Sequence, residues 1–303
     1  MAGYRPYPGR PLQADHPAAP RHRTARQRRP ARAPGRLRRA RAAAMSGPIA
    51  RLKAWRRERR MERVRPRRED FQRAVGRFPI LHDLPPPALD ALFERSTEIL
   101  AGKDFFGTQG LEPSPDDLLD VAVLAALPVL NLGVDWYRGF HTFILYPAEF
   151  VADVEEMDEV GLIHSGPEIR AGEAWAHGPV VLAMDEVRSS GQGEGFNVVA
   201  HELAHQIDQL NGDMDGYPPL HEGMDRQQWA SVFSAAWQRL QDEIQRGQEP
   251  TLDPYAAESP AEFFAVATEM YFDAPVWLHE QHPDMYTQLD QLYQMSKWFA
   301  KKD

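Results

Sequence analysis

The chain of 303 residues contains no cysteine. This absence excludes disulfides and thiolate metal sites, so any zinc ion would need histidine and carboxylate ligands. It fits a reducing compartment, although a secreted protein can also lack cysteine.

Long apolar runs are missing as well. The best candidate, VAVLAALPVLNLGV at residues 121–134, is shorter than the roughly 20 residues of a membrane span and contains Pro128 and Asn131. We expect this run to be buried core. Because the N-terminus also lacks the continuous apolar segment of a signal peptide, the sequence predicts a cytoplasmic protein.

Charge is distributed unevenly along the chain. Residues 1–68 contain 22 Arg and Lys against three acidic residues, a net charge of +19, whereas residues 69–303 contain 13 against 41, a net charge of −28. Residues 21–44 have too little apolar area to offset their chain entropy, which predicts disorder. Such a basic arm can bind nucleic acid. However, Met45 opens a more ordinary N-terminus, so residues 1–44 are better explained as an inert extension or a mis-called translation start.

The rest of the pattern predicts a mostly helical α+β fold with a small sheet. A basic helix is expected at 51–63, and the folded domain is expected to occupy residues 69–303. β-branched and aromatic runs at 140–147 and 178–187 predict strands. Helices are expected on both sides of them, and this order argues against an alternating parallel sheet. The helical ranges are 68–81, 85–100, 117–127, 194–210, 226–246, 260–272 and 282–300.

The clearest motif is HELAH at residues 201–205. On a helix, His201 and His205 lie one turn apart on the same face, so their imidazoles can bind one ion. Glu202 stands beside the first histidine, where it can accept a proton from water at the ion. A separate apolar stripe would anchor this helix, formed by Phe196, Val199, Ala200, Leu203 and Ile207.

A catalytic zinc site needs a third protein ligand. Asp208 and Asn211 stand where an extended metzincin motif requires glycine and histidine, so that class is excluded. The segment DPYAAESPAEFFAVATEMYF at 253–272 offers three carboxylates instead: Glu258, Glu262 and Glu269. Ser259 and Glu262 also match a capping box, so Glu262 has a structural explanation, and Glu269 remains a rival ligand on the same face.

Taken together, HELAHQIDQLNGD and DPYAAESPAEFFAV resemble the Mlc titration factor A family of zinc-dependent peptidases. A more distant likeness is to the metalloprotease domain of anthrax lethal factor. The resemblance covers roughly residues 70–300. It implies a zincin-like domain with metal ligands His201, His205 and Glu262, the general base Glu202, and an active-site tyrosine at Tyr255.

The resemblance also implies a function. The family's activity is zinc-dependent hydrolysis of peptide bonds, including aminopeptidase-like cleavage, on a peptide or protein substrate. The alternative is a regulatory protein that binds and sequesters a transcriptional repressor of sugar uptake, with peptidase activity secondary. The family further implies a substrate cleft edged by a strand; residues 178–184 are the candidate, with an internal strand as the alternative.

Two features near the motif stay open. Asp208 either orients a ligand imidazole or is a solvated residue at the helix end. Residues 211–222 follow the spacing of a calcium-binding EF-hand, with Asn211 at the first position and Gly216 at the sixth. Pro218 and Pro219 argue against calcium, and an acidic turn that ends the helix is the preferred explanation.

Overall fold

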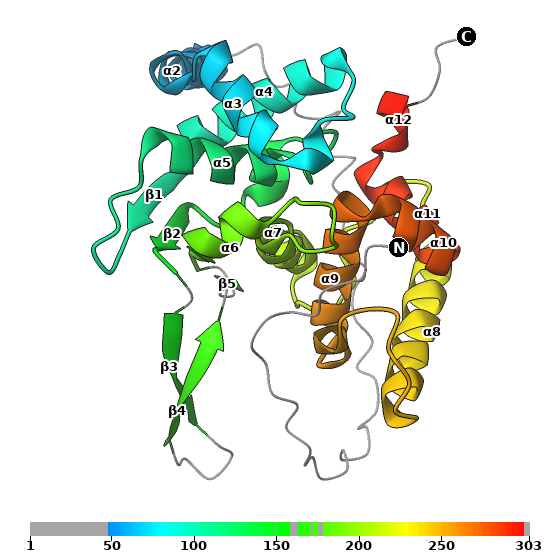
Figure 1. Cartoon of the computed structure of the whole chain (residues 1–303). Helices are drawn as coiled ribbons and strands as arrows, with labels where there is room; N and C mark the ends of the chain where they lie inside the picture. The colour runs from blue at the N-terminus through cyan, green and yellow to red at the C-terminus, as the bar shows by residue number, and fades with distance from the viewer. Residues whose placement is uncertain (1–47, 149, 158–162, 171, 175–177, 300–303) are drawn as a thin grey trace.

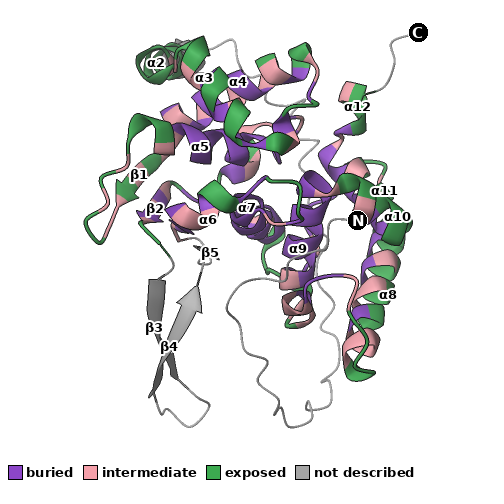
Figure 2. Cartoon of the chain, in the orientation of Figure 1, coloured by how far each residue is buried: buried purple, intermediate pink, exposed green. Residues whose placement is uncertain are grey.

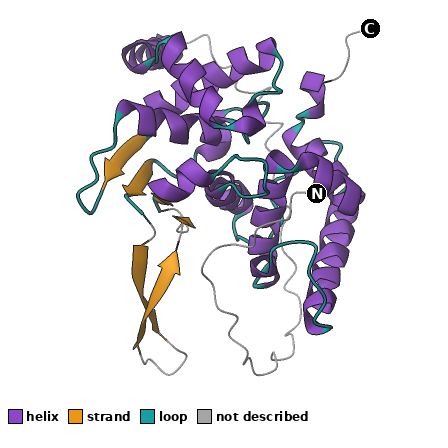
Figure 3. Ribbon diagram, in the orientation of Figure 1, coloured by secondary structure: helices purple, strands orange, loops and turns teal. Residues whose placement is uncertain are grey.

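Helices make up most of the molecule, and a small sheet lies beside them (Figures 1 and 3). The computed structural model describes residues 48–148, 150–157, 163–170, 172–174 and 178–299, with side chains for 55–148 and 178–299. The segment expected to be disordered, 21–44, lies outside these residues, as does Met45. The predicted mostly helical α+β fold is confirmed.

The basic helix expected at 51–63 is present as α2 (Pro48–Val64). It lies against α4 (Pro86–Gly102) and contacts it through polar groups. Arg57 forms an ion pair with Glu98 at 2.7 Å, and Arg60 donates a hydrogen bond to the carbonyl of Ala101 at 3.1 Å. The domain boundary between residues 68 and 69 stays a prediction. Helix α2, which precedes that boundary, is nevertheless in contact with α4.

Helices α3 (Arg68–Arg77), α4 and α5 (Pro115–Ala126) form one end of the molecule. Ser114 caps α5 in a reciprocal capping box with Asp117, and Pro115 occupies its first position. All residues from Leu119 to Ala126 are buried. The apolar run at 121–134 is therefore core, as expected, and burying it contributes much of the hydrophobic stabilisation of this end.

The sheet has the strand order β1-β2-β6-β5. Strands β1 (Asp104–Gly107), β2 (Thr142–Tyr146) and β6 (Val180–Ala183) are parallel, and β5 (Gly172–Ala174) is antiparallel to β6. The strand predicted at 140–147 is confirmed. The one predicted at 178–187 ends early, because α6 begins at Met184 and continues to Ser189.

Strand β6 is internal, so the expectation that residues 178–184 form a cleft edge is wrong. Each of its residues is buried, and it pairs with β2 on one side and β5 on the other. Its run of apolar residues is what a strand covered on both faces requires. Strand β5 forms the edge of the sheet next to β6, and it contacts α7.

A hairpin that the sequence did not indicate is formed by β3 (Phe150–Met157) and β4 (Ile163–Arg170). These two antiparallel strands extend away from the helical body, below the sheet in Figure 1. Their sequences lack the continuous apolar runs that identify a strand buried on both faces. The hairpin comes directly before β5 in the chain.

The C-terminal half is helical, and every residue of α7 (Val198–Asp208) is buried, as its purple ribbon in Figure 2 shows. Helices α9 (Pro260–Asp273) and α5 and strands β5 and β6 pack against α7. The helix expected over 282–300 is interrupted at Gln294, which adopts a left-handed conformation with φ 61° and ends α11. Among the described helices, none combines the length and apolar character that crossing a bilayer requires. The other elements here are α8 (Arg226–Gln245), η4 (Pro254–Ala257), α10 (Pro275–Gln281), α11 (Pro283–Tyr293) and α12 (Ser296–Phe299).

Candidate metal centre

Helix α7 holds the two histidines of the HELAH motif in a buried setting. Its N-terminus is capped by Asn197, whose Oδ1 accepts a hydrogen bond from the N–H of Ala200 at 3.0 Å. All residues of α7 are buried, including Val199, Ala200, Leu203 and Ile207 of the expected apolar stripe; Phe196, the remaining member, precedes the helix and is half-buried. The Nε2 atoms of His201 and His205 are 3.3 Å apart. The two rings therefore direct a nitrogen toward the same point, as ligands of one ion must.

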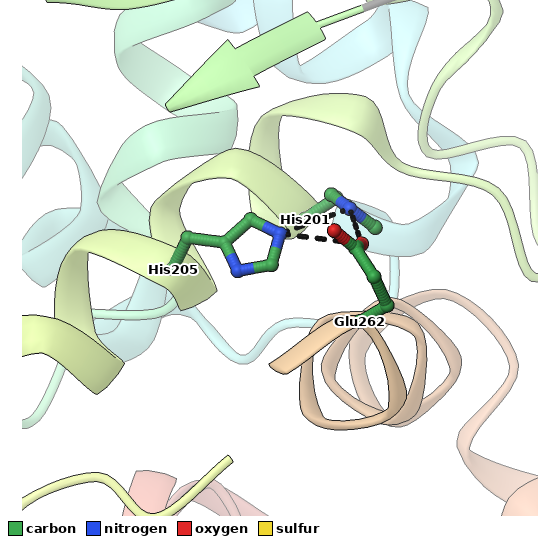
Figure 4. A group of neighbouring side chains, drawn as sticks. All are labelled: His201, His205 and Glu262. Atoms are coloured by element: carbon green, nitrogen blue, oxygen red, sulfur yellow. Dashed lines mark hydrogen bonds and ion pairs between the residues drawn. The ribbon is translucent and has the colours of Figure 1, made fainter. Parts of the chain in front are cut away.

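Glu262 completes the cluster from α9 (Figure 4). Its backbone N–H donates to the Oγ of Ser259 at 3.2 Å, so Ser259 caps the helix and one half of the predicted capping box is present. Its side chain points across to α7, where Oε2 lies 3.0 Å from Nε2 of His201 and 3.4 Å from Nε2 of His205. Only the backbone of Glu262 takes part in the cap, and its carboxylate reaches the histidines instead of returning to the N–H of Ser259.

Glu269, the rival ligand, lies behind His201. Its Oε1 is 2.7 Å from Nδ1 of that ring, and its Oε2 accepts a hydrogen bond from the N–H of Asn197 at 2.8 Å. A carboxylate on the far nitrogen fixes the tautomer and orientation of a metal-binding histidine. The place of Glu269 is therefore that of an orienting group, which sequence spacing did not distinguish from a ligand.

Asp273 continues the same face of α9, one turn after Glu269. It is buried, and its Oδ2 accepts a hydrogen bond from the N–H of Gly195 at 2.7 Å. Three carboxylates on one face of α9 thus contact α7 or the loop that leads into it. Sequence analysis missed the cap by Asn197 and the contact of Asp273. An asparagine just before an apolar helical run is a signal of an N-cap, and it could have identified Asn197.

Glu202 is almost completely buried, with 4% of its surface exposed. Burial raises the pKa of its carboxyl to about 7, while the neighbouring His201 and His205 oppose that shift. Its Oε2 has no hydrogen-bond partner within the described residues. A buried carboxyl that is neither neutralised by an arginine nor fully hydrogen-bonded is typical of a functional site.

Tyr255 lies in the short helix η4, which the buried carboxylate of Asp253 caps by accepting the N–H of Tyr255 at 2.9 Å. The tyrosine ring stacks on the imidazole of His201, with ring centroids 6.0 Å apart and an interplanar angle of 28°. The structure therefore brings Tyr255 beside His201, although η4 lies far from α7 in the sequence. Tyr255 stands seven residues before Glu262.

Asp208 is fully buried, so its description as a solvated helix-end residue is wrong. Its Oδ2 accepts a hydrogen bond from the N–H of Gly216 at 2.7 Å. Burial raises its pKa to about 7. The loop from 211 to 222 thus returns to the end of α7.

That loop does not gather its carboxylates around a common point. Asn211 donates to the carbonyl of Tyr217 at 2.8 Å, and Asp215 accepts the N–H of Tyr217 at 3.2 Å. Within the part of the chain that the structure describes, His201, His205 and Glu262 are the one group of three or more His, Cys, Asp or Glu with ligand atoms close enough to hold a metal. The loop is better described as a turn that ends the helix than as a calcium site.

The three clustered side chains fit a bound cation. Their ligand atoms all lie within 4.8 Å of one another, and two imidazoles with one carboxylate form a donor set of catalytic zinc sites. Burial disfavours a charged imidazole, yet Glu269 and Glu262 raise the pKa of His201 well above its usual value. Burial also opposes ionisation of Glu262, but the two histidines hold its pKa far below the ordinary range. The cluster thus favours positive charge between its carboxylates.

Comparison with known proteins agrees with this geometry. The sequence profile of the glucose-regulated metallo-peptidase M90 family matches residues 52–294. The chain belongs to this family. The match includes α7, η4, α9 and most of α2, and a family of metallopeptidases implies a metal ion at the site.

Several relatives carry the name Mlc titration factor A, so the resemblance noted in the sequence is confirmed. The chain is 38% identical to the protein of Klebsiella pneumoniae (strain 342) over 219 residues, which are 72% of this chain and 83% of the relative. Identity to the protein of Yersinia pestis (strain Pestoides F) is 37% over 219 residues, 71% of this chain and 81% of the relative. The likeness to anthrax lethal factor stays a prediction.

Proposed function

We propose that this M90-family chain is a zinc-dependent peptidase whose metal ligands are His201, His205 and Glu262. The observation that carries the proposal is the approach of the Glu262 carboxylate to both imidazoles, 3.0 and 3.4 Å from their Nε2 atoms. When bound there, zinc supplies a Lewis acid that polarises a carbonyl and lowers the pKa of a water molecule. The remaining chemistry belongs to side chains of this chain.

Glu202 is the proposed general base. Its carboxyl is buried beside His201, and burial holds its pKa at about 7, near the pH at which a base transfers protons efficiently. In this proposal, Glu202 accepts a proton from the attacking water and delivers it to the amine that leaves. Among the residues that the structure describes, no arginine or lysine forms an ion pair with Glu202. This supports the role, because such a salt bridge would lower the pKa of the carboxyl and weaken it as a base.

Tyr255 is the proposed oxyanion donor. Its ring stacks on His201 at the edge of the cluster. A phenol in this position can donate a hydrogen bond to the oxygen that becomes negative when water attacks a carbonyl. Glu269 and Asn197 would maintain the orientation of His201 during turnover.

The test is hydrolysis of a mixture of short peptides by the zinc-loaded chain and by Glu202→Gln. The amide keeps the size of the side chain but cannot accept the proton, so the rate should fall by 10²-fold or more, in line with the usual contribution of general base catalysis. Zinc content should stay at the wild-type level. Unchanged hydrolysis by Glu202→Gln would contradict the proposed mechanism.

We further propose that the peptidase activity is aminopeptidase-like, with cleavage at the free N-terminus of a peptide. Comparing a free peptide with its N-acetylated form separates exopeptidase from endopeptidase activity. Preference for the free amine, by 10-fold or more in kcat/KM, would support an aminopeptidase. Equal cleavage of both would contradict it. The cytoplasmic location stays a prediction from the sequence.

The relatives' name supports a second candidate, binding to a transcriptional regulator. Mlc titration factor A is a name for a protein that titrates Mlc, and we propose that this chain likewise binds a regulator of transcription. Purified Mlc is the first probe, tested with wild type and Glu202→Gln. Binding of Mlc by both proteins would support a regulatory function separate from hydrolysis. Absence of binding would contradict the proposal that this chain binds Mlc.

A further inference from the structure

Two buried polar atoms on α7 lack hydrogen-bond partners within the described residues: Nδ1 of His205 and Oδ1 of Asp208. They belong to residues three positions apart, which lie on the same face of a helix. Both side chains are buried, with 7% of His205 and none of Asp208 exposed. Burial is the main cause that raises the pKa of Asp208, and His205 is close enough to act in the opposite direction.

Metal binding determines what the Nδ1 atom of His205 must do. A neutral imidazole that gives Nε2 to an ion carries its proton on Nδ1, which then becomes a donor. A buried donor without an acceptor loses its hydrogen bond to water and destabilises the site. His201 has Glu269 on its Nδ1, at 2.7 Å, whereas no direct contact of this kind serves His205 in the described structure.

Resting on the proposed zinc site, we propose that Asp208 is a positioning residue for His205. Its Oδ1 accepts the hydrogen bond of the Nδ1–H group through one buried water molecule. No direct bond joins the two atoms, and a buried polar gap between two such partners is where ordered water is found. The two metal histidines would then each be oriented by a carboxylate, Glu269 directly and Asp208 through water.

The second oxygen of Asp208 connects this contact to the third ligand. Oδ2 holds the N–H of Gly216 at 2.7 Å, and the carbonyl of Gly216 accepts a hydrogen bond from Nε1 of Trp229 at 3.3 Å. A Cβ atom on Gly216 would lie 2.3 Å from the carbonyl oxygen of Pro260, the first residue of α9. Gly216 thus contacts the turn of α9 that contains Glu262. Asp208 joins the helix of the two histidines to the helix of the carboxylate ligand.

Asp208→Asn is the discriminating substitution. An amide of the same shape has only one acceptor oxygen, and the N–H of Gly216 occupies it. Its N–H₂ group can then only donate to the bridging water, so the charged acceptor on the His205 side is lost. Asp215→Asn is the matched control, because it removes the same charge from an exposed residue of the loop that follows α7. The measurements are the dissociation constant for zinc, by competition with a chromogenic chelator, and the melting temperature of the metal-free protein.

The expected result is a 10- to 100-fold weaker zinc affinity in Asp208→Asn, the usual effect of removing an orienting partner. The control should stay within twofold of wild type. Zinc affinity within twofold of wild type in Asp208→Asn would overturn the proposal. So would a weakened affinity accompanied by a lower melting temperature of the metal-free protein, because the role would then be structural.

NMR of the zinc-loaded wild type gives a second, independent measurement. A water-bridged Nδ1–H of His205 should appear as a slowly exchanging imidazole proton near pH 7, and rapid exchange with solvent would overturn the proposal. The failure of this inference can be told from failure of the proposed function. Wild type that binds zinc but hydrolyses no peptide contradicts the peptidase, whereas the zinc affinity of Asp208→Asn relative to wild type tests the positioning role.

Discussion

Oε1 of Glu269 lies 2.7 Å from Nδ1 of His201, on the opposite side of the ring from the Nε2 atom that faces Glu262. The two glutamates thus contact the same imidazole at different nitrogens. One is at the position of a metal ligand and the other at the position of an orienting partner. This difference leads to separate predictions for the two carboxylates.

Glu269→Gln should retain the metal but bind it about 10- to 100-fold more weakly, because the amide is a poorer acceptor for the imidazole N–H than the carboxylate. Competition with a chelator measures the change. Glu280→Gln, an exposed glutamate of α10, is the control and should match wild type. If Glu269→Gln bound zinc as tightly as wild type, the orienting role would be refuted.

Tyr255→Phe should lower kcat by about 10²-fold with a small effect on KM, the size expected for loss of one oxyanion donor. The reason is that the hydroxyl acts on charge that develops only during the reaction. Steady-state kinetics on one peptide suffices. Tyr286→Phe, whose ring packs on Tyr271, removes a half-buried hydroxyl elsewhere and should leave kcat unchanged. A kcat at the wild-type level in Tyr255→Phe would exclude this role.

Stability of the metal-free protein should fall as the pH rises. Burial raises the pKa of Glu202 and Asp208 to about 7. Burial disfavours charge on His201, but its two glutamates raise its pKa well above 6.5. A group whose pKa is higher in the folded than in the unfolded state binds a proton preferentially when folded, so its stabilisation is lost as the pH rises through the folded pKa.

For the two carboxyls, that loss spans the interval from about 4 to 7, and for His201 it continues above 6.5. We therefore expect a lower melting temperature at pH 8 than at pH 6 for the metal-free chain. Added zinc should raise the melting temperature more at pH 8, because fewer protons compete for the ligands. Thermal melts at both pH values, with and without zinc, measure both effects. Equal zinc stabilisation at pH 6 and pH 8 would argue against proton competition.

Gly216→Ala should destabilise the fold. Gly216 has φ 73°, a left-handed conformation that costs an alanine about 1–2 kcal/mol, and the added Cβ would also meet the carbonyl oxygen of Pro260 at 2.3 Å. Gly247→Ala is the matched control, since Gly247 has φ 64° and no atom within 4 Å of the Cβ position. Denaturant unfolding should show the larger loss for Gly216→Ala. Equal losses would mean that the contact with α9 is unimportant.

The sequence predicted most helices well, because the residues that start and stop a helix lie next to it in the chain. Ser259 occupies the N-cap position that its motif indicates, whereas the helix expected at 117–127 begins two residues earlier, after its cap Ser114. The helix expected over 282–300 is divided into α11 and α12, and its interruption was missed because it depends on Gln294, a left-handed residue that is not glycine. The hairpin β3–β4 was missed, since its strands lack the apolar runs of core strands.

For the site, the motif identified the two histidines, but spacing left Glu262 and Glu269 undistinguished. Both lie on one face of α9, and only the three-dimensional position of His201 between them separates their contacts. Gly216 is a similar case. It matched the sixth position of a calcium loop, whereas its N–H donates to Asp208 and its backbone approaches Pro260, so it links the end of α7 to the start of α9.

The most direct test of the account is a zinc titration of the metal-free chain, with peptide hydrolysis followed at each step for wild type and Glu262→Ala. The account predicts that wild-type activity rises in proportion to bound zinc and stops rising at one ion per chain. Glu262→Ala should bind zinc far more weakly and remain inactive at that ratio. Full zinc binding with undiminished hydrolysis in Glu262→Ala would contradict the assigned site.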